Sequence, residues 1–212
     1  MNLRQMRTIN LFAAGLLIVG MVPSTQAQSF EKGTSAINLG IGLGGYSYNY
    51  LRFYNNTIAS PTFSASYDLG IAQLGPDILS VGLLAGHNWR TYKATSTGST
   101  YTYIEKEVWS NTLIGLRAAY HFNWFHEIDK LDLYAGVMTG YSIGKHTDES
   151  TRTNRVTGVT EPWNQYNYVY NLNTPRIGAF VGVRYLFTNN FGVFAEAGYS
   201  VALINGGLTL KF

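Results

Sequence analysis

The chain has 212 residues, of which only 13% are charged, and it contains 23 glycines and no cysteine. Charged residues make up about 25% of an ordinary soluble domain, so this chain avoids charge. The lack of cysteine excludes a disulfide scaffold, a thiolate metal site and a lipid-modified N-terminal cysteine.

The first residues predict a cleavable signal peptide. Two arginines precede an apolar run at 9–22, and Pro23 and a small-residue site ending at Ala27 follow it, which is the order found in secretory signals. The alternative, a membrane helix, would need about 20 apolar residues and has fewer here. We therefore expect a signal peptide over 1–27 and a single domain over 28–212. Without the two arginines the formal charge falls from +3 to +1, so basicity does not point to nucleic acid.

In the remaining residues, apolar side chains recur at every second position, which predicts β-strands. Eight such stretches occur, at 35–46, 62–72, 78–91, 108–122, 131–144, 175–187, 191–200 and 204–212. No apolar run after residue 27 reaches the length of a membrane helix. The sequence therefore predicts an all-β protein.

The charged residues within these stretches all fall on the face opposite the apolar residues. They are Asp68, Arg90, Arg117, Asp132, Arg176, Arg184, Glu196 and Lys211. Because neighbouring residues of a strand point to opposite faces, one face of the sheet carries no charge. The other face is mostly Gly, Ser and Asn, whereas the wet face of a soluble sandwich or barrel would be rich in Lys, Glu, Thr and Gln. Small residues suit the inside of a narrow barrel, so we expect the apolar face to point outward, into lipid.

The connections between the stretches alternate in length. They are long at 47–60, 92–107 and 145–174 and short at 73–77, 123–130 and 188–190, with a further tight one near 201–203. Long external loops and short periplasmic turns are typical of outer-membrane barrels, in which the tight last connection would be an exception.

Aromatic residues near the strand ends predict a girdle at each membrane interface. One set is Tyr46, Trp89, Tyr141 and Tyr199, and the other is Tyr120, Phe122, Trp124, Tyr185, Phe187, Phe191 and Phe212. An unpaired backbone group in hydrocarbon costs several kcal/mol, so the last stretch should pair with the first. We predict an eight-stranded antiparallel up-and-down transmembrane β-barrel.

The signal peptide, the eight stretches and the terminal sequence "FGVFAEAGYSVALINGGLTLKF" resemble the small eight-stranded outer-membrane barrels of the OmpA/OmpX type. The resemblance covers 28–212 and extends to the porin-like outer-membrane barrel proteins of Bacteroidetes-type bacteria. It implies an integral protein of the Gram-negative cell outer membrane, in contact with membrane lipid. It also implies that the barrel-assembly machinery reads Leu208, Leu210 and Phe212 on the terminal strand.

Lumen charges should pair, because an isolated charge in a narrow barrel is costly to desolvate. Hairpin geometry places His121 near Asp132 across the 123–130 turn, as a pair at the periplasmic rim, and Glu196 diagonal to Arg184. With Arg117 at a similar depth, we expect Arg117, Arg184 and Glu196 to form a cluster that plugs the barrel. A gate for ions is the functional interpretation of this cluster, and a structural staple is the one we favour.

Two glycine or serine motifs match functional patterns only formally. Gly40-x-Gly42-x-x-Gly45 fits a dinucleotide fingerprint, but no helix follows to hold a pyrophosphate. "GYSIG" around Ser142 fits a nucleophile elbow, but it lies inside an alternating stretch and not at a strand-to-helix turn. We predict no cofactor and assign Ser142 to the lumen wall.

The histidines offer no metal-ligand spacing, so no metal site is predicted. Outer-membrane lipid A acylases use a His and a Ser on strands. His87 or His146 with Ser142 or Ser150 would be the corresponding residues here, but no His-x-Ser spacing is present. We predict no catalytic residues.

The leading functional hypothesis is a non-enzymatic outer-membrane barrel with a structural or cell-surface interaction role. The alternatives are a narrow pore or transporter for small solutes and, less favoured, a lipid-modifying enzyme. Tyrosines and tryptophan in 47–60 and 145–174 could bind an extracellular protein or glycan. Alternate tyrosines at Tyr166, Tyr168 and Tyr170 could equally extend a strand above the membrane.

Overall fold

The computed structural model describes residues 30–44, 57–123, 130–163, 169–171 and 173–212. The expected signal peptide at 1–27, most of 47–60 and the aromatic residues Tyr46 and Trp124 lie outside these residues. No helix in the described part of the chain is long and apolar enough to cross a bilayer.

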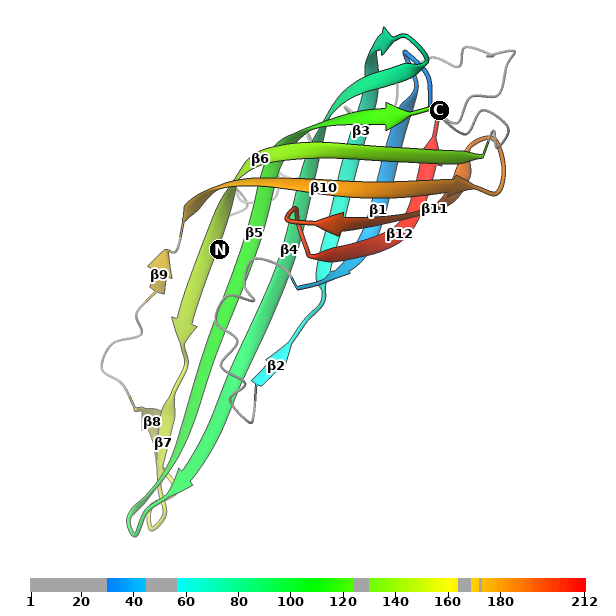
Figure 1. Cartoon of the computed structure of the whole chain (residues 1–212). Coiled ribbons are helices and arrows are strands. Elements are labelled where there is room, and N and C mark those ends of the chain that lie inside the picture. Colours follow the sequence, from blue (N-terminus) through cyan, green and yellow to red (C-terminus); the bar gives the residue numbers. More distant parts are fainter. Residues whose placement is uncertain (1–29, 45–56, 124–129, 164–168, 172) are drawn as a thin grey trace, which may run out of the picture.

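Eight long strands form the barrel (Figure 1). They are β1 (Ser35–Leu43), β3 (Thr62–Leu74), β4 (Asp77–Thr97), β5 (Tyr101–Phe122), β6 (Leu131–Asp148), β10 (Thr174–Leu186), β11 (Phe191–Gly198) and β12 (Ile204–Lys211). Each of the eight predicted stretches coincides with one of these strands. Four short strands accompany them, namely β2 (Thr57–Ala59), β7 (Thr151–Asn154), β8 (Thr160–Pro162) and β9 (Val169–Asn171).

The barrel is closed, because its first and last strands pair. β1 pairs antiparallel with β12 from Ala36 opposite Lys211 to Leu43 opposite Ile204, and with β3 on its other side. The pairing continues through β4, β5, β6, β10 and β11 back to β12, antiparallel at every step. The predicted fold class, an eight-stranded antiparallel up-and-down barrel, is confirmed.

Polar side chains inside the barrel reinforce the seam between the two ends of the chain. Asn38 on β1 accepts a hydrogen bond from the hydroxyl of Thr209 on β12 at 2.7 Å and donates one to Ser66 on β3 at 3.0 Å. Ser35 and Phe212 exchange backbone hydrogen bonds of 2.7 and 2.9 Å. The terminal residue is therefore held in the sheet.

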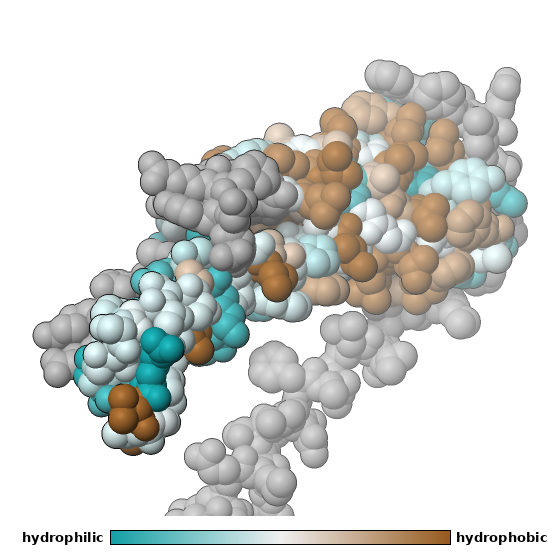
Figure 2. Space-filling model, turned by 90° about the horizontal axis from the view of Figure 1, so that it is seen from below, coloured by the Kyte–Doolittle hydropathy of each residue, from teal (hydrophilic) through white to brown (hydrophobic). Residues whose placement is uncertain are grey.

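The apolar face points outward, as predicted. Leu39, Leu116 and Val181 are each 59% exposed, while the alternate residues of the same strands face the lumen. Figure 2 shows apolar surface gathered over the barrel and hydrophilic surface over the part of the sheet that extends beyond it. Exposed aromatic residues occur near both strand ends, at Trp89, Tyr141 and Tyr199 and at Tyr185, Phe187, Phe191 and Phe212.

Two connections predicted as loops are largely strand. β4 runs to Thr97 and β5 begins at Tyr101, so the loop expected at 92–107 is a tight turn at 98–100. The 145–174 segment contains the end of β6 and strands β7, β8 and β9. These residues include many Thr and Tyr, which favour strands, but they show no sustained apolar alternation. The result is a sheet of β4, β5, β6, β7 and β8 that continues beyond the barrel (Figure 1), called here the extended sheet.

The lumen is packed with large and small side chains in alternation. Tyr134 lies over Gly182, where an added Cβ would come within 2.4 Å of the ring, and Phe180 lies over Gly136 in the same way, at 2.5 Å. Further buried apolar residues lie beside these two rings. One of them is Met138, an apolar side chain on the inner face of β6, where the sequence predicted polar or small residues. The sequence expectation of a lumen lined mainly by Gly, Ser and Asn is therefore incomplete, since aromatic and aliphatic side chains fill it.

Candidate functional site

A buried cluster of charged side chains in the lumen is centred on Arg184 of β10. Its Nη1 donates to Asp132 Oδ2 at 2.5 Å and its Nη2 donates to Asp68 Oδ2 at 3.2 Å. The guanidinium group is fully buried, and so are both carboxylates. Charge-assisted hydrogen bonds of this kind satisfy a buried arginine whose desolvation would otherwise be costly.

His121 on β5 contacts the same cluster through Asp132. Its Nδ1 lies 2.8 Å from Asp132 Oδ1, and its Nε2 lies 2.9 Å from the hydroxyl of Ser80 on β4. Phe30, from the segment before β1, stacks on the imidazole with ring centroids 3.9 Å apart. The Arg184 guanidinium also faces the Phe30 ring, at 5.5 Å.

Arg117 on β5 forms a second centre, one layer further along the barrel. Its Nη2 donates to Glu196 Oε1 at 2.7 Å, and its Nε lies 2.9 Å from Asp68 Oδ1. The guanidinium group lies over the Phe180 ring at 4.2 Å, a cation–π contact. Tyr134 donates to the same Glu196 oxygen at 3.0 Å.

The structure brings together most of the predicted lumen residues, with one rearrangement. Arg117 contacts Glu196, and His121 contacts Asp132. The ion pairs of Arg184 are with Asp132 and Asp68, not with Glu196, to which the sequence assigned it. In the observed register Arg184 lies opposite Asp132 on β6 and Phe194 on β11, so Asp132 is its direct cross-strand partner.

Asp68 is the functional residue that the sequence-based pairing missed. It bridges Arg117 and Arg184, which lie on strands that are not its neighbours. The alternation of apolar and polar residues predicted that Asp68 faces the lumen. Its partners follow from the closure of the barrel, which brings side chains from distant strands together across the lumen.

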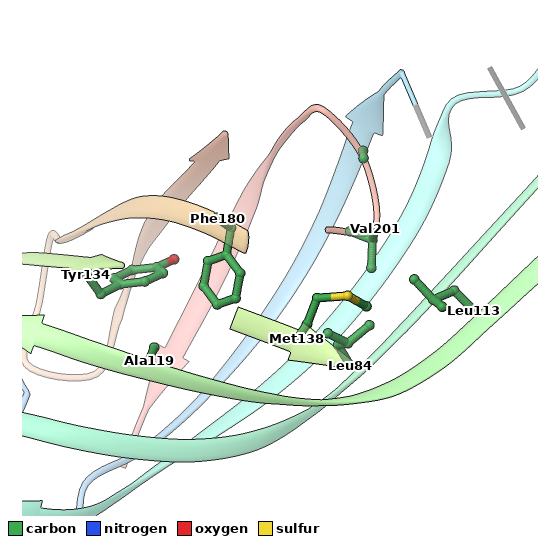
Figure 3. Close-up of a cluster of buried hydrophobic side chains, with 8 residues drawn as sticks. Leu84, Leu113, Ala119, Tyr134, Met138, Phe180 and Val201 are labelled. Carbon is green, nitrogen blue, oxygen red and sulfur yellow. The ribbon is translucent and has the colours of Figure 1, made fainter. Parts of the chain in front are cut away.

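Both ends of the lumen are filled by residues that do not belong to the barrel strands. Phe30 is fully buried at the end where the described chain begins, in contact with Ala36 and Ile78. At the opposite end, Val201 and Ala202 from the β11–β12 turn join Leu84, Leu113 and Met138 in one apolar cluster (Figure 3). The charged network therefore lies between two apolar seals.

The residues of the formal motifs have structural neighbours. An added Cβ on Gly40 would lie 2.8 Å from Phe194, and one on Gly42 would lie 2.5 Å from Ala202, so close packing accounts for both glycines. Ser142 donates to Asn111, and Gly45 lies outside the described residues.

The residues considered for lipid modification have different partners from one another. His87 bonds Thr112 at 2.8 Å and His146 bonds Glu107 at 3.0 Å. The Ser150 hydroxyl accepts a hydrogen bond from the backbone N–H of Lys106. Among the residues that the structure describes, no three His, Asp or Glu side chains are arranged to hold a metal ion.

Leu208 and Leu210 on β12 are half exposed on the outer face, and Phe212 follows them with its ring 41% exposed. These residues, which the resemblance assigns to recognition by the assembly machinery, are thus accessible on the outer face of the barrel. Their role in assembly stays a prediction.

No protein-family description matches the sequence, and no curated protein matches it either. Solved structures with a similar course of the chain include the attachment invasion locus protein Ail of Yersinia pestis in complex with the heparin analogue sucrose octasulfate, with 12% identity and a TM-score of 0.41 over 86% of this chain and 100% of that one. The N-terminal β-barrel domain of Pseudomonas aeruginosa OprF has 16% identity and a TM-score of 0.39 over 85% and 98%. Ail solved without the analogue has a TM-score of 0.37. The assignment of the fold rests on the strand pairing of this chain.

Proposed function

We propose that the chain is an integral outer-membrane β-barrel without enzymatic activity, with a structural or cell-surface interaction role and a lumen plugged by paired charges. The observation that carries this proposal is the belt of outward apolar side chains around a closed barrel. Leu39, Ile114, Val137 and Leu208 belong to it and are all more than half exposed. A monomeric soluble protein rarely exposes so large a contiguous apolar surface, whereas lipid tails would cover it at no cost.

The two ends of the barrel differ, which supports an orientation. The described N-terminal segment, the C-terminus, the turns after β3 and β10 and the end of β5 lie at one end of the barrel, and the extended sheet leaves the other. Short turns face the periplasm and longer structures face outward in outer-membrane barrels. We place the extended sheet outside the cell, where it is available to a protein or glycan.

A plugged lumen favours a structural or interaction role over transport. Eight strands enclose a space only wide enough for side chains. Arg117, Arg184 and Glu196 lie within this space, and each is paired with an oppositely charged buried side chain. Phe30 and Val201 close the two ends. A solute would have to displace both an apolar seal and a network of buried ion pairs.

The purified full chain is expected to require detergent or lipid to stay in solution, and to migrate faster on a denaturing gel without boiling than after boiling. The reason is that a closed sheet whose backbone groups are all paired resists detergent until it is heated. Identical migration of both samples, or stability in buffer without detergent, would contradict a membrane barrel.

The same protein in a planar lipid bilayer is expected to give no reproducible single-channel currents. The test variant is Arg117→Ala, which removes the cation that pairs with Glu196 and Asp68. The control is Lys130→Ala, which removes one positive charge at an exposed position before β6. Reproducible channels in the unmodified protein that widen in Arg117→Ala, but not in Lys130→Ala, would favour the pore over the plug.

A further inference from the structure

The extended sheet has an outward face that continues the lipid-facing side of β4, β5 and β6. β4 and β5 pair without a register shift, so the outward side chains of the barrel and of the extended sheet lie on one continuous face. Trp89, Ser110 and Lys145 form the first row above the belt, directly opposite one another on the three strands. Lys145 follows the exposed belt residue Ile143 by two positions. A cation therefore lies at the level where the apolar belt ends.

Two further lysines lie on the same face, and they oppose each other. Lys93 on β4 and Lys106 on β5 are direct cross-strand partners. Like charges in this position destabilise a sheet pair unless an anion lies between or beside them. They lie four residues beyond the Trp89 row, about 13 Å along the strand at ~3.3 Å per residue.

The outward face of the extended sheet carries fewer acidic residues than lysines. Among the described residues the carboxylate that meets this face is Glu149, which lies between β6 and β7 and pairs with Lys106 at 2.5 Å. The opposite face of the sheet has the reverse bias. It carries Glu105, Glu107, Asp148 and Glu161 against Arg90 and Arg152. The two faces of one sheet thus differ in sign, with the basic face continuous with the lipid-facing side.

We propose that Lys93 and Lys145, with the ion-paired Lys106 opposite Lys93, form a docking surface for the phosphorylated glycolipid headgroups of the outer leaflet. This inference rests on the proposed outer-membrane location and orientation. Long lysine stems can lie along the sheet while the ammonium groups reach headgroup phosphates.

Continuity with the lipid-facing belt distinguishes this occupant from a soluble partner. The lysines begin in the row of Trp89, an aromatic residue of the kind that sits at the membrane interface. A soluble acidic protein would need to reach a surface that adjoins the headgroups. A leaflet lipid is already there.

The test measures binding of bisphosphorylated lipid A to the detergent-solubilised full chain by native mass spectrometry, with the dephosphorylated lipid as the second probe. Lys93→Gln/Lys145→Gln is the test variant. Lys32→Gln/Lys130→Gln removes the same charge from exposed positions at the opposite end of the barrel and is the matched control. A lysine within a screening length of an anionic lipid surface contributes about 1 kcal/mol, and Lys93 lies further out than Lys145, so the test variant should bind the bisphosphorylated lipid about 5- to 30-fold more weakly. The control should bind it as the unmodified protein does.

Equal binding by the test variant and the control would overturn the proposal, and so would equal affinity of the unmodified protein for both lipids. Full displacement by inorganic pyrophosphate at constant ionic strength would assign the site to a soluble phosphate compound and would also overturn it. The gel migration of each variant before and after boiling separates this result from failure of the barrel itself. If the heat-dependent shift is kept and lipid selectivity is absent, the docking surface is wrong and the barrel stands.

Discussion

Arg184→Gln is expected to lower the free energy of unfolding of the barrel by about 3–5 kcal/mol, because it leaves a buried carboxylate without its cation. Arg184 is fully buried and pairs with Asp132 and Asp68. Asp68 keeps Arg117 as a second partner, whereas Asp132 keeps the His121 imidazole but loses its arginine. Urea unfolding of vesicle-inserted protein, followed by tryptophan fluorescence, measures the difference.

A second variant separates charge from packing. Arg184→Gln/Asp132→Asn removes the orphaned charge together with its partner, and it should be less destabilised than the sum of the two single variants. Arg155→Gln, at an exposed turn position, should change stability by no more than about 1 kcal/mol. Strict additivity of the two single variants would mean that the network is not a coupled unit.

Val181→Arg is expected to cost about 2–4 kcal/mol, as arginine does on the lipid face near the bilayer midplane. Val181 is 59% exposed, and the same substitution on a soluble protein's surface would be nearly neutral. Leu116→Arg, at an equally exposed position, should behave in the same way. The measurement is again urea unfolding from vesicles of defined phospholipid.

The neighbouring residue provides the internal contrast. Gly182→Ala points a methyl group into the Tyr134 ring, with 2.4 Å between the new Cβ and the ring carbons, and should destabilise by about 1–3 kcal/mol through crowding. Thr153→Arg, in the extended sheet, should be tolerated. If Val181→Arg were tolerated as well as Thr153→Arg, the outward face would not be in lipid.

The barrel strands could be predicted because their two faces meet different surroundings. An exposed outer face, which we propose meets lipid, and a narrow lumen impose a period of two. Leu116 on the outer face is followed directly by Arg117 in the lumen. The ends of β4 and β5 could not be predicted in this way. In the proposed orientation both faces of these strand ends meet water, so Thr95 and Glu105 show no apolar alternation although they belong to strands.

The lumen site could be predicted only where the partners are neighbours in a hairpin. His121 and Asp132 flank one turn, and their contact follows from that. The bridge from Asp68 to Arg117 depends on closure, which the alternation predicts without fixing which side chains meet across the lumen. Phe30 precedes the first strand and carries no periodic signal, so its insertion beside His121 could not be inferred.

The length of the extended sheet determines which charges act on a ligand at its tip. From Ser110, in the row of Trp89, to Tyr101 at the far end of β5 is nine residues, about 30 Å at ~3.3 Å per residue. At physiological ionic strength a charge is screened within about 8 Å. In the proposed orientation the tip therefore lies several screening lengths from the leaflet. A soluble ligand at the tip would interact with the nearby charges of Arg152 and Glu161, because the charges of the leaflet would be screened.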